Sequence, residues 1–267
     1  MVDEAEVVLG EGTAAVLDVL GFKAARRTHG VEKLVSAVRR LRQHMEMDEG
    51  VRQIFGGTST TTAAFSDSVI LTKAAGQLDA DGTRETLSQT VEHTAAAAAQ
   101  LVTDAISGDV PLPFRGCIAA GPLLVFGDIF VGDAIDAAAE FAEQALAAVV
   151  WLAPSALKAL SASRRRSILM LVEWEVPLRG GRIETLVVNP FWQSALLTPT
   201  QENAEAEFAE LTTKLLAPFD GVDALDVAQK RQNTASFLRH AAAVSRDKWK
   251  DLEDHTWRRT AREGSDH

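Results

Sequence analysis

The sequence predicts an α+β fold, in which a sheet carries helices on one face and a helical extension follows. Up to Asn189-Pro190, short β-branched runs alternate with longer helical patterns in the order β-α-β-β-α-β-β-α, and further strands follow. Beyond that point only helical patterns remain. The chain has 267 residues, 46 % hydrophobic and 24 % charged, so it can bury a sizeable core.

The N-terminal half contains four clear elements. Residues 14–20 form an apolar run whose length and β-branched content predict a buried strand. Apolar residues recur at spacings of three and four over 31–41, which predicts a helix. The β-branched stretch 58–72 predicts a hairpin or bent strand pair with its tip near Ser66-Asp67-Ser68. Residues 84–106 include an alanine run and predict a packed helix.

The second half begins with two expected strands within residues 114–131, separated near Gly121-Pro122, with a further turn at Gly127-Asp128. The other predicted elements are a helix at 133–148, a strand at 149–152, a short helix at 154–161, and a strand pair at 168–175 and 183–188 joined at Gly180-Gly181. This order of elements is related to ferredoxin-like layouts.

The change to helical patterns predicts two units: residues 1–198, and a helical extension at 199–267. Phe208, Leu211 and Leu215 form one apolar stripe of the extension. Three roles stay open for it: dimer contacts, sensing of an activating signal, and plain packing.

The net charge of −10 argues against nucleic-acid partners, because affinity for a phosphate backbone comes mainly from clustered Lys and Arg. A nucleoside triphosphate bound through divalent cations is a different case, since its site requires acidic ligands. The charge therefore excludes one class of polyanion and permits the other.

The sequence also indicates a cytoplasmic location. No apolar run approaches the roughly 18–20 residues of a membrane span, so we expect no membrane partner. The acidic N-terminus, Met1-Val-Asp-Glu, lacks the basic start of a secretory signal. A single cysteine, Cys117, suits a reducing compartment, and its apolar strand predicts a buried, inert thiol.

Several common chemistries lack their motifs. The sequence contains no phosphate-binding G-x-x-x-x-G-K-[ST] loop and no G-x-G-x-x-G after a strand. It has no G-x-S-x-G nucleophile elbow, and its six histidines lack zinc-ligand spacing.

Two aspartates stand out because each adjoins an apolar strand and a turn. Asp18 interrupts the first strand, and Asp67 lies at the edge of another apolar run. A carboxylate in such a place is costly unless it is paired, hydrogen-bonded or metal-bound. For either residue alone, a cap on a neighbouring turn is the simpler interpretation. Together they indicate a shared divalent-metal site, and Gly21 would let a phosphate approach the following helix start.

Four segments follow one another along the chain: Asp18-Val-Leu-Gly-Phe22, Ser66-Asp67-Ser68, Arg115-Gly-Cys-Ile-Ala-Ala-Gly121 and Gly132-Asp-Ala-Ile-Asp-Ala-Ala138. They resemble the signature blocks of the class III nucleotidyl cyclase catalytic domain. They occur in the family's order over about residues 10–195, and their order makes the resemblance stronger than any single block. The first two are especially similar to the pyrimidine cyclases of the Pycsar anti-phage system, which convert CTP or UTP to the 3′,5′-cyclic nucleotide.

The resemblance implies a ferredoxin-like cyclase palm fold and assigns roles to individual residues. Asp18 and Asp67 match the aspartates that bind two Mg²⁺ or Mn²⁺ ions, and the Val19 carbonyl matches a backbone ligand. The loop that holds the triphosphate corresponds to Leu20, Gly21 and Phe22. Phe65 and Ser66 fall in the substrate-binding region. Arg115 is either a phosphate-binding arginine or a structural arginine paired with a carboxylate.

The departures from the family pattern concern the base and the transition state. Purine cyclases usually carry a lysine where this chain has Ala63, and the partner aspartate position falls near Ile129, one residue from Asp128. The helix that usually supplies asparagine and arginine has Asp136 and Glu140 in the matching places. An acidic residue cannot replace an arginine that stabilises a developing phosphorane.

We expect a pyrimidine cyclase that makes cUMP or cCMP from UTP or CTP, acts in anti-phage defence and requires a separate effector protein. Sites at a two-fold interface are expected, hence a homodimer. Three alternatives stay open: a divergent adenylate or guanylate cyclase, a degenerate nucleotide-binding or dimerisation module, and an unrelated ferredoxin-like fold with structural aspartates.

Overall fold

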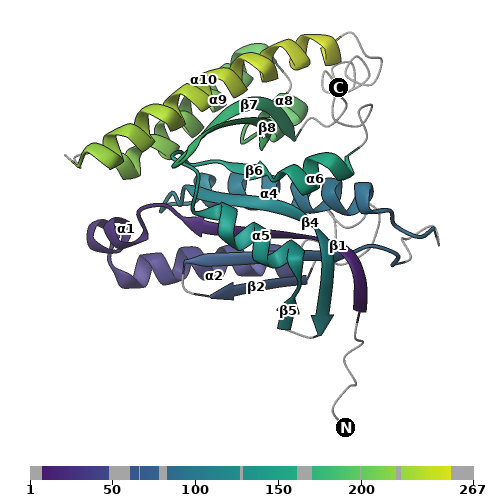
Figure 1. The fold of residues 1–267 in the computed structure, drawn as a ribbon. Coiled ribbons are helices and arrows are strands. Elements are labelled where there is room, and N and C mark those ends of the chain that lie inside the picture. The colour runs from purple at the N-terminus through teal and green to yellow at the C-terminus, as the bar shows by residue number, and fades with distance from the viewer. Residues whose placement is uncertain are drawn as a thin grey trace.

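The described part of the chain forms one mixed sheet with helices on both sides and at one end, as a computed structural model shows (Figure 1). The structure describes residues 8–47, 61–65, 67–77, 83–126, 129–160, 170–198, 200–220 and 224–253. The strands are β1 (Val8–Val19), β2 (Thr61–Phe65), β3 (Ser68–Ala74), β4 (Phe114–Phe126), β5 (Ile129–Val131), β6 (Val150–Leu152), β7 (Leu171–Leu178) and β8 (Gly181–Val188). The helices are α1 (Phe22–His29), α2 (Val31–Met47), α4 (Leu87–Ser107), α5 (Asp133–Ala142), α6 (Pro154–Ala159), α8 (Trp192–Leu197), α9 (Gln201–Leu216), η1 (Ala217–Phe219) and α10 (Leu225–Glu253).

The strand order is β2-β3-β1-β4-β6-β8-β7, and β5 pairs with β4 outside that path. Its first four members, β2-β3-β1-β4, follow the ferredoxin-like order that the sequence predicted. Most neighbours are antiparallel, but β4 and β6 run parallel. The expected α+β class and the strand pair at 58–72 are confirmed.

Helices cover both faces of this sheet, which corrects the expectation of helices on one face (Figure 1). Thr13 of β1 hydrogen-bonds Thr90 of α4 at 2.8 Å. Its neighbour Gly12 pairs with Gly121 of β4, where an added Cβ would lie 3.8 Å from Ala134 of α5. Successive strand residues point to opposite faces, so α4 and α5 lie on opposite sides. We call the side that carries Gly12 and Gly121 the α5 face.

Strand β4 continues through Gly121-Pro122, where a break between two strands was predicted from the sequence. Pro122 pairs with Glu11, whose carbonyl accepts a hydrogen bond from Ala75 on the β3 side. The pair is therefore not hydrogen-bonded, and the proline nitrogen faces the other edge of β4. That edge is open here, since β6 pairs with residues 116–118 and β5 with 124–126, so the missing N–H costs no ladder bond.

The helix expected at 133–148 ends at Ala142, six residues early. Beyond it, Ala145 forms a bridge with Leu178, and Leu146 donates its N–H to the Pro177 carbonyl. The backbone of this segment is thus used by β7, which prevents the helix from continuing.

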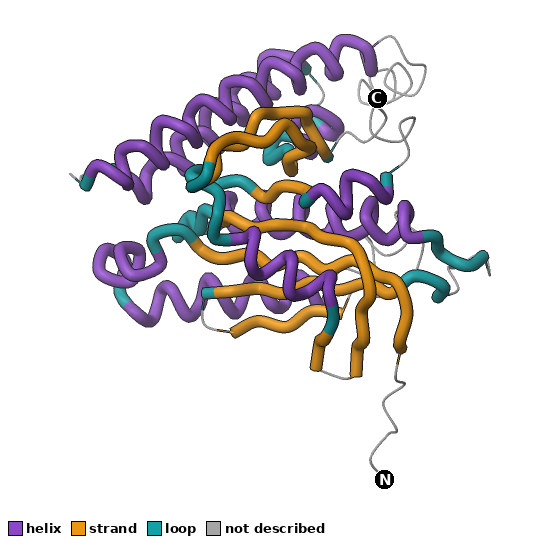
Figure 2. The backbone as a smooth tube through the Cα atoms, in the orientation of Figure 1, coloured by secondary structure: helices purple, strands orange, loops and turns teal. Residues whose placement is uncertain are grey.

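The C-terminal helices pack over β7 and β8 at one end of the molecule (Figures 1 and 2). Phe237 of α10 lies 5.1 Å from Trp174 of β7, between ring centroids. Phe191 and Phe208 pack at 4.9 Å and join α9 to the segment after β8. The predicted helices of the extension are confirmed, whereas the domain boundary near residue 198 stays a prediction.

Two further expectations concern single features. Cys117 is buried, and burial strongly raises the pKa of its thiol, in agreement with an inert side chain. No helix in the described ranges is long and apolar enough to cross a membrane.

Candidate functional site

The site begins with Asp18, near the end of the central strand β1. It pairs with Ser68 of β3 on one side and with Arg115 of β4 on the other. Asp18 lies an even number of residues from Gly12, so its side chain is on the α5 face. Its side chain is only 25 % exposed.

Asp67 lies next to this strand end, in the turn before β3. The Val19 N–H donates to the Asp67 carbonyl at 2.9 Å. The N–H and C=O of one strand residue point to the same edge, so the Val19 carbonyl also faces the Asp67 side. The structure therefore brings together the three residues expected to bind metal: Asp18, Val19 and Asp67.

Arg115 is paired with Asp18. Its Nη2 and Nε atoms donate to Asp18 Oδ2 at 3.0 and 3.3 Å, and its Nη1 donates to the Glu143 carbonyl at 3.4 Å. The side chain of Arg115 is 12 % exposed. Of the two interpretations open for Arg115, this geometry corresponds to the arginine paired with a carboxylate.

Burial raises the pKa of the Asp18 carboxyl above its ordinary value. The hydrogen bonds and charge of Arg115 lower the pKa, whereas the carboxylates of Asp67 and Glu143 raise it further. Asp18 is thus a partly desolvated carboxylate with only one cationic group acting on it among the described residues. Such an environment favours a bound cation.

The loop after β1 leads directly into helix α1. Leu20 donates its N–H to the Pro113 carbonyl at 2.8 Å, and Gly21 adopts a left-handed conformation with φ of 75° at the N-cap. No side chain caps this helix start, at which Phe22 is the first residue. The N–H groups at an uncapped helix start can donate to an anion, so the geometry is compatible with a phosphate at Gly21 and Phe22. The Leu20 N–H is already used by Pro113, so the structure gives Leu20 no free backbone donor.

The other residues expected at the site are placed less closely. Ser66 and Asp128 lie outside the described residues, as does the side chain of Phe65, whose backbone pairs with Ser68. Ala63 pairs with Ile70, on the α5 face and half-buried. Ile129 lies on β5 and is exposed.

Helix α5 presents acidic residues to solvent above this face. Asp136, Glu140 and Glu143 are exposed and are spaced by four and three residues, which places them on one side of the helix. Glu143 was not predicted as a site residue, although its carbonyl accepts a hydrogen bond from Arg115 and its charge acts on the pKa of Asp18. Its i+3 spacing from Glu140 was the only available signal.

The donor set fits a divalent cation. Two carboxylates and a backbone carbonyl are oxygen ligands of the kind that Mg²⁺ and Mn²⁺ take, and Mg²⁺ commonly uses one or two carboxylates together with substrate phosphates. Among the described residues, no group of three or more His, Cys, Asp or Glu side chains is arranged so that it could hold a metal ion by itself. The protein would therefore share the coordination of a cation with a phosphate-bearing ligand.

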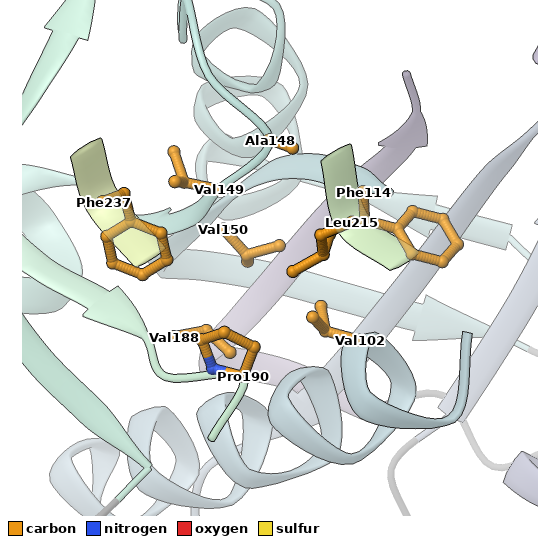
Figure 3. Close-up of a pocket in the computed structure, with 9 residues that line it drawn as sticks. All are labelled: Val102, Phe114, Ala148, Val149, Val150, Val188, Pro190, Leu215 and Phe237. Atoms are coloured by element: carbon orange, nitrogen blue, oxygen red, sulfur yellow. The ribbon is translucent and has the colours of Figure 1, made fainter. Parts of the chain in front are cut away.

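Three pockets in the described part of the chain lie away from Asp18. The void in Figure 3 has a volume of about 10 Å³, room for one water at most, and is lined only by apolar side chains. A larger hollow of about 460 Å³ lies between α4, α8 and α9, away from Asp18. The void is lined by Val102, Phe114, Ala148, Val149, Val150, Val188, Pro190, Leu215 and Phe237.

The candidate site is instead an open part of the α5 face. Val16, Ile70 and Ser68 are half-buried there, whereas Leu17 and Leu71 on the opposite face are buried. A ligand or a second protein surface could therefore cover these residues without rearrangement of the core.

No family model and no curated protein matches the sequence. Among solved structures, the chain is similar to the catalytic core of a rhodopsin-guanylyl cyclase with converted specificity, solved with ATPαS. The identity is 14 % and the TM-score 0.50, and the match covers 69 % of this chain and 97 % of that one. Adenylate cyclases from Trypanosoma brucei in their monomeric state also match, at 14 % identity, 67 % and 88 % coverage and a TM-score of 0.48.

The similarity to the rhodopsin-guanylyl cyclase core shows the fold. The chain has the α+β palm fold of a class III nucleotidyl cyclase catalytic domain, with a mixed sheet and C-terminal helices. The predicted fold class is confirmed.

Proposed function

We propose that the chain is a nucleotidyl cyclase that converts a pyrimidine nucleoside triphosphate, UTP or CTP, to the 3′,5′-cyclic nucleotide and pyrophosphate. The observation that carries this proposal is the meeting of Asp18 and Asp67 at adjacent strand ends, beside the uncapped start of α1. A triphosphate bound through cations needs carboxylates on one side and N–H donors on the other. The site offers both.

Different residues of the site would bind the cations and the triphosphate. Asp18, Asp67 and the Val19 carbonyl would hold two divalent cations, Mg²⁺ or Mn²⁺, and the backbone N–H groups at Gly21 and Phe22 would hold the triphosphate. When bound, the cations supply charge neutralisation at the α-phosphate and pyrophosphate and a lower pKa of the 3′-hydroxyl. The protein then contributes mainly positioning, and no separate side-chain base is required.

The preference for a pyrimidine is supported by Ala63. This half-buried position on the α5 face carries a lysine in most purine cyclases, where it contacts the base. An alanine offers no hydrogen bond to a purine edge. Phe65 and Ser66 are adjacent in sequence and are the proposed contacts to the nucleoside.

A homodimer is supported by the incomplete cover of the α5 face and by exposed apolar residues near it. Phe126, Ile129 and Val131 lie in or beside β5 and are 41–56 % exposed. A second copy would bury them and close the open site from above. We further propose a role in anti-phage defence, in the cytoplasm, with a separate effector protein that binds the cyclic product.

The test is incubation of purified protein with each of the four NTPs and Mn²⁺, with product identified by mass spectrometry and pyrophosphate measured in parallel. Cyclic UMP or cyclic CMP is the expected product. Turnover of ATP or GTP alone would refute the pyrimidine preference and leave a cyclase.

A second candidate is a nucleotide-binding module without turnover. It is favoured by the acidic side of α5, because Asp136 and Glu140 would repel a phosphorane. It predicts Mn²⁺-dependent binding of a nucleotide and no cyclic product with any NTP.

A further inference from the structure

Arg115 directs two hydrogen bonds to a single oxygen of Asp18. A guanidinium often binds both oxygens of a carboxylate with two parallel hydrogen bonds. Here Nη2 and Nε converge on the single atom Oδ2, at 3.0 and 3.3 Å. Among the described residues, no donor reaches the other oxygen, Oδ1, and the side chain of Asp18 as a whole is 25 % exposed. Oδ2 of Asp18 thus accepts two hydrogen bonds, whereas Oδ1 accepts none from the described residues.

The guanidinium is itself held in place. Its third nitrogen, Nη1, donates to the Glu143 carbonyl just beyond α5. Arg115 and Asp18 are also directly paired across β4 and β1. The side chain is only 12 % exposed, so few alternative rotamers are open to it. Gly116, the next residue, has no room for a side chain, because an added Cβ would lie 2.5 Å from the Val16 carbonyl. The backbone that carries Arg115 is therefore closely packed on β1.

We infer that Arg115 is a positioning residue for cation binding: by holding Oδ2 it fixes the orientation of Asp18 and leaves Oδ1 for a divalent cation. The inference rests on the proposed function, because it takes Asp18 as a cation ligand. It replaces a direct role of Arg115 on substrate phosphate with a role exerted through Asp18.

Two effects of Arg115 on a cation oppose each other. Its positive charge repels the cation, and because both side chains are largely buried, solvent screens that repulsion only in part. Its hydrogen bonds fix the ligand, and loss of partners that orient metal ligands typically weakens metal binding by about 10- to 100-fold. We therefore expect the loss of orientation to outweigh the loss of repulsion, so removal of Arg115 weakens binding.

The experiment is titration of the purified full-length chain with Mn²⁺ alone, with free Mn²⁺ followed by electron paramagnetic resonance. Arg115→Gln should raise the dissociation constant about tenfold or more. Arg115→Lys keeps the positive charge but cannot donate the same pair of hydrogen bonds to Oδ2. Its dissociation constant should lie between those of Arg115→Gln and wild type. Arg182→Gln breaks an exposed pair with Glu175 at 2.8 Å and is the matched control, expected to bind as wild type.

The outcomes separate the two claims. If wild type binds Mn²⁺ and Arg115→Gln binds equally or more tightly, the positioning role is wrong while the cation site stands. If neither wild type nor Asp18→Asn differs from a blank, the proposed cation site itself fails. Thermal unfolding without metal checks that each variant folds. Should Arg115→Gln not fold, Arg115→Lys decides alone, since wild-type affinity for Mn²⁺ in that variant would contradict the inference.

Discussion

The Lys73 ammonium lies 3.4 Å from the Glu85 carboxylate, with both side chains almost fully excluded from solvent. The other oxygen of Glu85 lies 2.9 Å from Nδ1 of His93 on α4. Lys73 pairs with Thr13, so this charged cluster lies on the face opposite Asp18, toward the far end of β3. Burial lowers the pKa of the Lys73 ammonium, opposed by the charge of Glu85. The cluster therefore links three parts of the chain: Lys73 on β3, Glu85 in the segment before α4, and His93 on α4.

Removal of the charge of Glu85 should strongly destabilise the fold. Glu85→Gln leaves the buried Lys73 without its anion, and loss of one partner of a buried pair typically costs about 3–5 kcal/mol. Urea unfolding followed by circular dichroism measures the change. The matched control is Glu175→Gln, whose pair with Arg182 is exposed and should contribute about 0–1 kcal/mol. Equal losses in the two variants would contradict the buried cluster.

Stability should fall as the pH drops below about 6.5, because burial lowers the pKa of the His93 imidazole from its ordinary value of 6.5, and the charge of Lys73 lowers it further. Glu85 and Glu92 act in the opposite direction. The unfolded chain then binds a proton at a higher pH than the folded chain, so acid favours unfolding. Free energies of unfolding measured from pH 7.5 to 5 should fall less steeply in His93→Gln. His29→Gln, in α1, should keep the wild-type slope.

The proposed cyclase activity should depend on Asp67. Its backbone carbonyl accepts the Val19 N–H, and a side-chain substitution preserves this bond, so Asp67→Asn should fold normally. Loss of a metal ligand removes several kcal/mol of transition-state stabilisation, on the order of a hundredfold or more in rate. The rate of pyrophosphate release with UTP and CTP measures it. Wild-type turnover in Asp67→Asn would remove this residue from the proposed site.

The proposed dimer should depend on β5. Ile129 is 52 % exposed, and Ile129→Glu places a charge where a second copy would bury an apolar side chain. Light scattering after size-exclusion chromatography should show a monomer with reduced turnover. Val31→Glu is the control, because Val31 is 59 % exposed and belongs to α2, a helix on the opposite side of the sheet from α5 (Figure 1). A dimer that persists in Ile129→Glu would place the interface elsewhere.

The C-terminal helices should be required for stability. Phe237 is 2 % exposed and borders the void in Figure 3, together with residues of α4 and β6. Phe237→Ala should therefore cost about 3–5 kcal/mol. Calorimetry would show this as one lowered transition; an unchanged main transition would mean that the extension folds separately.

Sequence patterns predicted the order of strands and helices well, because period-2 and period-3.6 apolar spacing is a local property. They did not reveal the second helical layer, since Ala14 and Ala15 are both buried and the strand lacks alternation. The break expected at Pro122 does not occur, because the proline nitrogen faces an open edge of β4. Which edge of a strand is open cannot be read from a local sequence pattern.

The candidate site shows the same division. Asp18 and Asp67 were identifiable because carboxylates beside apolar strands are uncommon and costly. The partner of Asp18 was not identifiable, because its pairing with Arg115 follows from the register of two strands far apart in sequence. The role of the Glu143 carbonyl likewise depends on where α5 ends.

The central place of β1 has a consequence for folding. Asp18 meets Arg115 across 97 residues of chain, and its pairing with Ser68 on the other side also spans a long connection. Closing such loops is entropically unfavourable until many other contacts form, and folds rich in distant contacts assemble slowly. An intermediate with native helices and an unfinished sheet would have Asp18 but neither of its neighbours. Recovery of Mn²⁺ binding during refolding should therefore trail the return of helical circular dichroism and coincide with completion of the sheet.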